Sequence, residues 1–290
     1  MNRYSEYEAL VAPARARSEL WQLVLGVCAT LIGYVALVYA ALSIVLTVPS
    51  LLKSFQSTGT PTGMMFTLFS FGFLTLALLV ALRLVHHRGL PTLLGDARQC
   101  LHQFRATLKA LLLLSVVVWL IPSVEGMDLF PNLEMSRWLL LLPLSLFGVL
   151  IQSGTEELVF RGYLQSQLAA RFRSPLIWIL VPSILFGALH YEPDFYGPNA
   201  IYVVISTTCF GIAAADLTAR SGTLGPALAL HFVNNLTALL LFGMQGDLSG
   251  LALYVLPFGP ADTDFIRDAL LIDAAILLCS WLAARLALRR

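Results

Sequence analysis

Charge is the scarcest property of this sequence. Only 12% of its 290 residues are Asp, Glu, Lys or Arg, while 58% are hydrophobic. A soluble globular domain has roughly 25% charged and 45–50% apolar residues. The formal net charge is +1, whereas nucleic-acid binding requires clustered Lys and Arg. The composition therefore excludes a nucleic-acid partner and predicts a polytopic protein whose surroundings are a lipid bilayer.

Cysteine is sparse as well. The four cysteines are Cys28, Cys100, Cys209 and Cys279, and no two of them form a CxxC pair. This spacing indicates neither a disulfide framework nor a thiolate metal site. The sequence also contains no stretch of soluble-domain composition, no internal repeat and no low-complexity tail.

Apolar blocks of about 20 residues dominate the sequence, and a helix of this length spans the roughly 30 Å hydrocarbon core of a bilayer. The first block is far longer than the roughly 7–15 apolar residues of a cleavable signal peptide, so we predict a retained helix. The blocks predict an all-α fold, a polytopic transmembrane helical bundle of about eight transmembrane helices. The predicted spans are Leu20–Leu46, Met64–Val85, Leu108–Ser123, Trp138–Phe160, Leu176–His190, Ile201–Leu217, Leu224–Phe242 and Phe265–Leu286.

The basic residues between these blocks predict an orientation, because short cytoplasmic loops carry an excess of Lys and Arg. With both termini inside, fourteen of the 18 Lys and Arg residues fall in inner segments. Only Lys53, Arg137 and Arg267 fall in outer ones. The prediction is therefore N-in and C-in. An eight-helix chain of this size suggests the plasma membrane of a bacterium.

The predicted spans and orientation divide the chain into four segments. Residues 1–19 form a cytoplasmic N-terminal segment, and 20–137 form three transmembrane helices with a basic inner loop. Residues 138–242 form a core of four transmembrane helices, and 243–290 form an outer loop and the last transmembrane helix. His86, His87 and His102 fall in the basic loop, where we expect solvated surface positions.

Polar residues within the predicted spans are few. A charged group at bilayer depth costs at least about 2.5–3.5 kcal/mol, so such residues usually face the protein interior and usually have a function. Asp216 with Arg220 is spaced i, i+4 near the inner surface and is interpreted as a solvated ion pair, whereas Asp273 receives no role. The remaining intramembrane polar residues are Glu156, Glu157, Arg161, His190, His231, Asn234 and Asn235.

The stretch EELVFRG separates its two acids by geometry. Glu157 and Arg161 are spaced i, i+4 with the acid first, the favourable order for an ion pair on one helix face. Glu156 points about 100° away from Glu157. We therefore predict a structural ion pair between Glu157 and Arg161, and a Glu156 carboxylate that faces a cavity as a candidate general base.

His190, on another predicted helix, lies at a depth similar to that of Glu156. Glu156 lies 15 residues before Arg171 and His190 lies 16 residues after Ser174, so at about 1.5 Å per residue both are some 22–24 Å along their helices. A glutamate and a histidine brought together in this way could share the deprotonation of a water.

The segment HFVNN places His231 and Asn235 one turn apart on one helix face. Two N–H donors on a rigid helix suit a developing oxyanion. The adjacent Asn234 is interpreted instead as a packing or capping hydrogen-bonder.

These residues resemble a known family. EELVFRG, FGALH and SGTLGPALALHFVNN are similar, in order and spacing, to the EExxxR, FxxxH and HxxxN/D motifs of the CAAX prenyl endopeptidase-like family. These intramembrane proteases are also called CPBP or Abi proteins. The resemblance covers roughly Trp138 to Leu241, and three motifs in register make it specific.

The resemblance implies an intramembrane endopeptidase with Glu156, His190, His231 and Asn235 as catalytic residues. Glu156 and His190 would activate a water, and His231 and Asn235 would stabilise the tetrahedral oxyanion. The family is often described as metalloproteases, but the sequence lacks HExxH, and a glutamate–histidine base needs no zinc in principle. Metal-independent chemistry with no cofactor is therefore favoured, and zinc is the alternative.

Two other functions fit the same residues. One is a catalytically silent membrane scaffold or bacteriocin-immunity protein of the same fold, which predicts the loss of a catalytic position; none is lost here. The other is a transporter with Glu156 in an acidic relay, which favours an internal repeat. For the protease, the expected partner is a peptide or a membrane-protein segment. The sequence leaves open the individual substrate, the membrane face to which the site opens and the oligomeric state.

Overall fold

A computed structural model describes residues 3–47, 55, 57–121 and 128–289. Lys53 and Ser123 lie outside these residues, as does the side chain of Arg267. The described helices and strands are η1 (Ser5–Tyr7), α1 (Glu8–Val11), η2 (Ala12–Arg17), α2 (Leu20–Val45), α4 (Pro61–Ala81), η3 (Leu82–His86), α5 (Pro91–Leu94), α6 (Ala97–Trp119), β1 (Phe130–Pro131), α7 (Met135–Glu157), η4 (Leu158–Gln165), α8 (Ser166–Arg171), α9 (Pro175–Ala188), α10 (Pro193–Tyr196), η5 (Gly197–Asn199), α11 (Ala200–Ser221), α12 (Gly225–Leu236), η6 (Thr237–Leu241), β2 (Phe242–Gly243), β3 (Tyr254–Val255) and α13 (Thr263–Leu288).

The apolar blocks of the sequence are helical, and the all-α class is confirmed. Six helices of the described residues are long and apolar enough to cross a membrane, and the chain is an integral membrane protein. The other two predicted spans correspond to shorter apolar helices, Pro175–Ala188 and Gly225–Leu241. Eight spans and the N-in, C-in orientation stay predictions.

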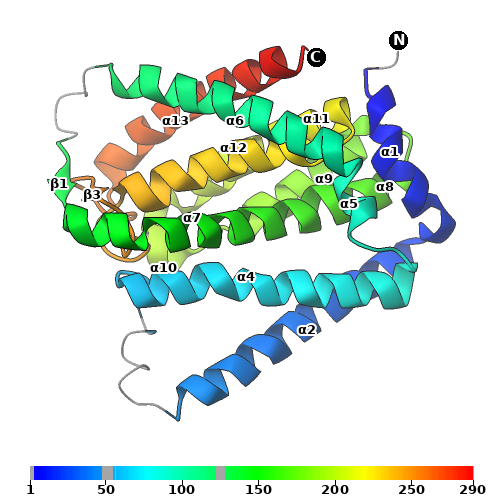
Figure 1. The fold of residues 1–290 in the computed structure, drawn as a ribbon, viewed down its shortest axis with the longest axis horizontal. Coiled ribbons are helices and arrows are strands. Elements are labelled where there is room, and N and C mark those ends of the chain that lie inside the picture. The colour runs from blue at the N-terminus through cyan, green and yellow to red at the C-terminus, as the bar shows by residue number, and fades with distance from the viewer. Residues whose placement is uncertain (1–2, 48–54, 56, 122–127, 290) are drawn as a thin grey trace.

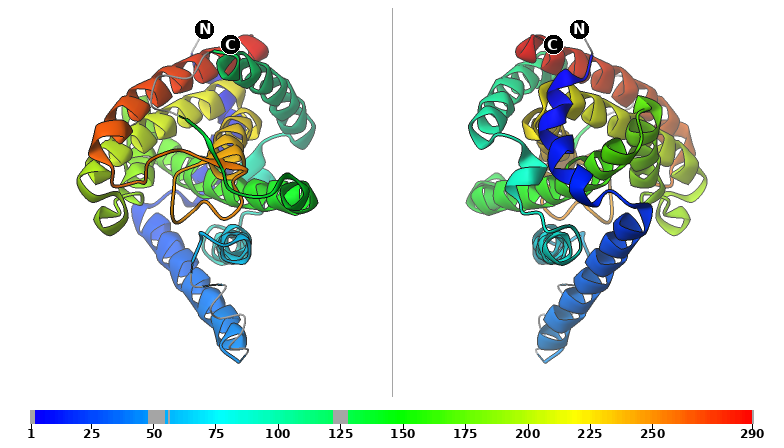
Figure 2. Two further views of the ribbon diagram at one scale, coloured as in Figure 1. Left: turned by 90° about the vertical axis from the view of Figure 1, so that its left-hand side faces the viewer. Right: turned by 90° about the vertical axis from the view of Figure 1, so that its right-hand side faces the viewer.

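The long helices pack into a bundle from which one helix projects. In Figure 1, α4, α7 and α12 run side by side across the molecule, and both views of Figure 2 show α2 leaving the body beside α4. Within α2, only Gln22, Gly26 and Thr30 are buried, so most of its apolar surface is available to lipid. The largest buried cluster joins α4, α6, η4, α9, α11, α12 and α13.

The helix that begins with α7 continues beyond the predicted span. It runs for 37 residues, from Met135 to Arg171, and contains all of Trp138–Phe160, whose boundaries in the membrane stay predictions. Its middle part, η4, is a π-helix. Single π turns inside α-helices frequently mark functional sites, and this one follows directly after Glu157.

Three two-residue strands connect the loops at the start of α7. The strand order is β1-β3-β2, with Phe130 opposite Val255 in the antiparallel pair and Phe242 opposite Tyr254 in the parallel pair. The indole N–H of Trp138 donates to the carbonyl of Leu240 over 2.8 Å. These bonds hold the first turn of α7 against the end of η6.

The interpretation of Asp216 and Arg220 as a solvated pair is wrong. Both side chains are buried, and the Arg220 Nε donates to Asp216 Oδ2 over 2.7 Å. The Tyr4 hydroxyl and the Trp281 indole also donate to this carboxylate, over 2.8 and 3.0 Å. The N-terminal residues therefore cover the end of α11. Burial, together with the hydrogen bond to Asp216, raises the pKa of Tyr4 to about 12.

His86 also departs from the prediction. Its Nε2 lies 2.8 Å from the Tyr163 hydroxyl and its Nδ1 3.1 Å from the carbonyl of Arg17, and the ring is buried. His87 and His102 are exposed, as predicted. The difference arises because η2 folds back over His86 and shields it, which the local sequence does not reveal.

A close helix approach near the site is between α9 and α11. A Cβ on Gly187 would lie 2.6 Å from the carbonyl oxygen of Val204 and would also meet the Thr208 hydroxyl. Facing it, a Cβ on Gly211 would lie 2.9 Å from the Cβ of Ser183. Small residues permit such close packing of membrane helices. Gly187 thereby sets the position of the helix end that carries His190.

Gly187→Ala is expected to lower the free energy of unfolding by about 1–3 kcal/mol, because the added methyl group must push α9 away from α11. Thermal unfolding in detergent measures the effect. The matched control is Gly72→Ala in α4, where the nearest atom to an added Cβ is 3.9 Å away. Equal melting temperatures for the two variants would contradict this packing.

Candidate active site

Glu157 and Arg161 form a buried ion pair where α7 passes into η4. The Arg161 Nη1 lies 3.2 Å from Glu157 Oε1, and both side chains are 1% exposed. The guanidinium also donates to the carbonyl of Gly211 over 3.3 Å and lies 4.8 Å from the ring centroid of Phe186. Although the helix widens to π geometry here, the i, i+4 contact that the sequence predicts is present.

His231 of α12 lies between the two glutamates. Its Nδ1 is 2.7 Å from Glu157 Oε1 and its Nε2 is 3.3 Å from Glu156 Oε2. Glu157 therefore binds a histidine as well as Arg161, a contact that spacing along one helix could not predict. The Nδ1–H donates to the Glu157 carboxylate, which turns Nε2 towards Glu156. The ring orientation is thus set by a residue of another helix.

Glu156 and Glu157 occupy different surroundings, as the helix geometry predicts. The Glu157 side chain is 1% exposed and the Glu156 side chain 14% exposed. Glu156 borders a cavity, and among the described residues its close ionic neighbour is His231. One glutamate is therefore held by buried partners and the other retains an open side.

His190 follows the last turn of α9. Its Nδ1 donates to the carbonyl of Phe186 over 2.9 Å, and the two rings pack with their centroids 4.9 Å apart. Because Nδ1 carries the proton in this bond, Nε2 carries a lone pair. His190 and Glu156 border the same cavity, although the described structure has no hydrogen bond between them.

Asn235 and a residue missed in the sequence form a second polar contact. The amide Nδ2 of Asn235 donates to Gln152 Oε1 over 2.7 Å, and Asn234 donates to Asn235 Oδ1 over 3.2 Å. Gln152 lies one turn before Glu156 in an apolar stretch, and that i, i+4 spacing was the available signal. The Asn235 amide that would bind an oxyanion is therefore occupied by another amide.

One cavity of about 110 Å³ joins these groups. Its volume accommodates more than one water, since a water in the liquid occupies about 30 Å³. It brings together all four predicted catalytic side chains, and Asp273 of α13 borders it too. The lining residues are Gln152, Glu156, Phe186, His190, Ser206, Thr207, Phe210, His231, Asn234, Asn235, Asp273 and Leu277.

The donor set does not fit a zinc site in this arrangement. In the described part of the chain, no group of three or more His, Cys, Asp or Glu side chains is placed to hold a metal ion. A zinc site usually takes three or four such ligands.

Comparison with known proteins agrees with the motifs. Residues 137–237 match the family model described as type II CAAX prenyl endopeptidase Rce1-like. This segment is therefore similar to the CAAX prenyl endopeptidase-like family. The resemblance deduced from the three motifs is thereby confirmed. The CAAX protease-like segment covers about a third of the chain and contains Glu156, His190, His231 and Asn235.

The chain is also similar to the uncharacterized protein YyaK of Bacillus subtilis (strain 168), with 33% identity over 129 residues. The match covers 44% of this chain and 43% of that protein, so the chain matches less than half of its relative's length. No solved structure matches the chain. The roles of the CAAX protease-like residues, and the segment boundaries at 138 and 242, therefore stay predictions.

Arg161→Ala is expected to lower the free energy of unfolding by about 3–5 kcal/mol, because it leaves a buried carboxylate without its cation. The double variant Arg161→Ala/Glu157→Gln is expected to be less destabilised, since the neutral amide still accepts the His231 hydrogen bond. Thermal unfolding in detergent distinguishes the two variants.

The matched control is Arg173→Ala, which removes an exposed arginine. Melting temperatures of Arg161→Ala and Arg173→Ala that both equal that of wild type would show that the buried ion pair is not a stabilising contact.

Proposed function

We propose that this chain is an intramembrane endopeptidase that hydrolyses a peptide bond with a water activated by Glu156 and His190. The observation that carries the proposal is the shared cavity, bordered by Glu156, His190, His231 and Asn235. The match of residues 137–237 to the CAAX prenyl endopeptidase model supports the reaction class. The substrate is a peptide or a segment of a membrane protein, and the membrane is the plasma membrane of a bacterium.

Water attack needs a base and a second acceptor. Glu156 takes the proton of the attacking water while His190 Nε2 accepts its other hydrogen and orients it. The water oxygen bonds to the substrate carbonyl carbon, and the carbonyl electron pair moves to its oxygen. When the C–N bond breaks, Glu156 returns the proton to the departing nitrogen. General acid–base catalysis of this kind contributes typically 10²–10⁴-fold.

The tetrahedral oxyanion is stabilised by His231 and Asn235. In the resting site, the Nε2–H of His231 donates to the Glu156 carboxylate, and the two atoms lie 3.3 Å apart. As Glu156 takes the proton of water, it ceases to attract this N–H, which then donates to the oxyanion. Glu157 and Arg161 hold the imidazole in place without contacting the substrate. Asn235 exchanges its bond with Gln152 for one to the same oxygen.

Glu156→Gln is expected to abolish proteolysis of a quenched peptide library in detergent, because an amide cannot accept the proton of water. Its melting temperature stays close to that of wild type, since Glu156 is not the partner of Arg161. The matched control is Glu192→Gln, which alters an exposed acid close to His190 in the sequence. Full activity of Glu156→Gln would overturn the mechanism.

Asn235→Ala is expected to lower kcat by about 10²–10³ with little change in KM, as for the removal of one oxyanion donor. Because the proposed chemistry uses no metal, activity is also expected to survive exhaustive zinc chelation. Steady-state kinetics and elemental analysis of active protein measure both. Stoichiometric zinc together with chelator-sensitive activity would assign His231 to a metal instead.

A further inference from the structure

Asp273 is a carboxylate within an apolar helix. It belongs to the part of α13 that is long and apolar enough to cross a membrane, Ala269–Leu288. Carboxylates within membrane-spanning segments are rare and usually mark a function. The Ser206 hydroxyl donates to the Asp273 carboxylate over 3.3 Å. The proposed hydrolysis gives Asp273 no task.

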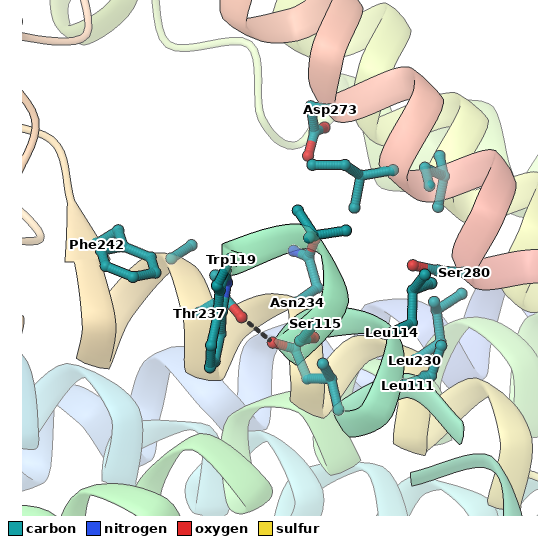
Figure 3. A pocket seen from close by; sticks show the side chains of 15 residues that line it. Leu111, Leu114, Ser115, Trp119, Leu230, Asn234, Thr237, Phe242, Asp273 and Ser280 are labelled. Atoms are coloured by element: carbon teal, nitrogen blue, oxygen red, sulfur yellow. Dashed lines mark hydrogen bonds between the residues drawn. The ribbon is translucent and has the colours of Figure 1, made fainter. Parts of the chain in front are cut away.

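Asp273 lies where two cavities meet. Beside the catalytic cavity is an apolar cleft of about 230 Å³ between α6, α12 and α13. Asn234, Asp273 and Leu277 border both spaces. Figure 3 shows Asp273 on one side of this cleft and Asn234 and Trp119 on the other. Asp273 therefore borders both the cleft and the cavity that contains Glu156.

In the described structure, the two cavities are lined by acidic side chains but by no Lys or Arg. Among the described residues that line them, the carboxylates are Glu156 and Asp273, and none is Lys or Arg. A substrate that presents a free C-terminal carboxylate finds no Lys or Arg side chain among these described residues. A substrate with a cationic side chain finds the exposed carboxylate of Asp273, which carries the opposite charge.

We propose that Asp273 is a specificity-determining residue that binds a Lys or Arg side chain of an internal peptide segment seated in the apolar cleft. The scissile bond of that segment lies in the catalytic cavity. This inference rests on the proposed endopeptidase function and narrows its substrate class from any peptide to one with a basic residue near the cleaved bond. The Ser206 hydroxyl orients the carboxylate.

The test uses quenched peptides that differ at a single position, which carries Lys, Gln or Glu. This position is moved in turn along both sides of the cleaved bond. The expected wild-type result is a kcat/KM for Lys that exceeds that for Gln by about tenfold or more at one position. Asp273→Asn is expected to reduce this ratio to about two or less. Asp194→Asn, which alters an exposed acid outside both cavities, is expected to preserve it.

A binding measurement separates this inference from the proposed hydrolysis. The labelled Lys and Gln peptides are titrated against Glu156→Gln and against Glu156→Gln/Asp273→Asn. Tighter binding of the Lys peptide to the first variant alone supports the inference, even if no peptide is cleaved. Equal binding of the two peptides to Glu156→Gln, or a Lys preference that survives Asp273→Asn, overturns it. Cleavage that is independent of Glu156 overturns the hydrolytic mechanism alone.

Discussion

The cost of burying the Glu157 carboxylate is the constraint on which the rest of the site depends. A buried charge persists only when it is paired and hydrogen-bonded. Glu157 meets this requirement with Arg161 from η4 and His231 from α12. Arg161 in turn bonds to a carbonyl of α11 and lies over an aromatic ring of α9. One carboxylate thereby makes four helical segments converge at the point where the candidate reaction takes place.

This convergence also explains why two adjacent glutamates can differ so much. Glu157 holds the imidazole that faces Glu156, so the buried acid determines the surroundings of the exposed one. The aromatic rings of Phe186 and Phe210 lie against His231, and they shield the imidazole from competing polar groups. Two glutamates that are adjacent in the sequence therefore differ: Glu157 is held by buried partners, and Glu156 borders the cavity.

The sequence predicts what depends on local pattern. Apolar block length located the helices, and the angle between consecutive helical residues separated Glu156 from Glu157. Local pattern does not predict the burial of a side chain when its neighbours come from residues far along the chain. Asp216 is buried because Tyr4 and Trp281 reach it, and His86 because η2 covers it. Gln152 was missed because its partner, Asn235, lies 83 residues away. The π turn at η4 has no local signature of this kind either.

The cluster around Asp216 has a consequence for biosynthesis. Tyr4 and Asp216 are separated by 212 residues, so at roughly 5–20 residues per second the ribosome needs on the order of 10–40 seconds between them. Trp281 arrives 65 residues later still. During this interval the N-terminal residues lack the acid that receives them, and a chaperone or a protease can reach them. The Trp281 bond cannot form before residue 281 has been synthesised, so the cluster is completed only after the preceding helices have been made.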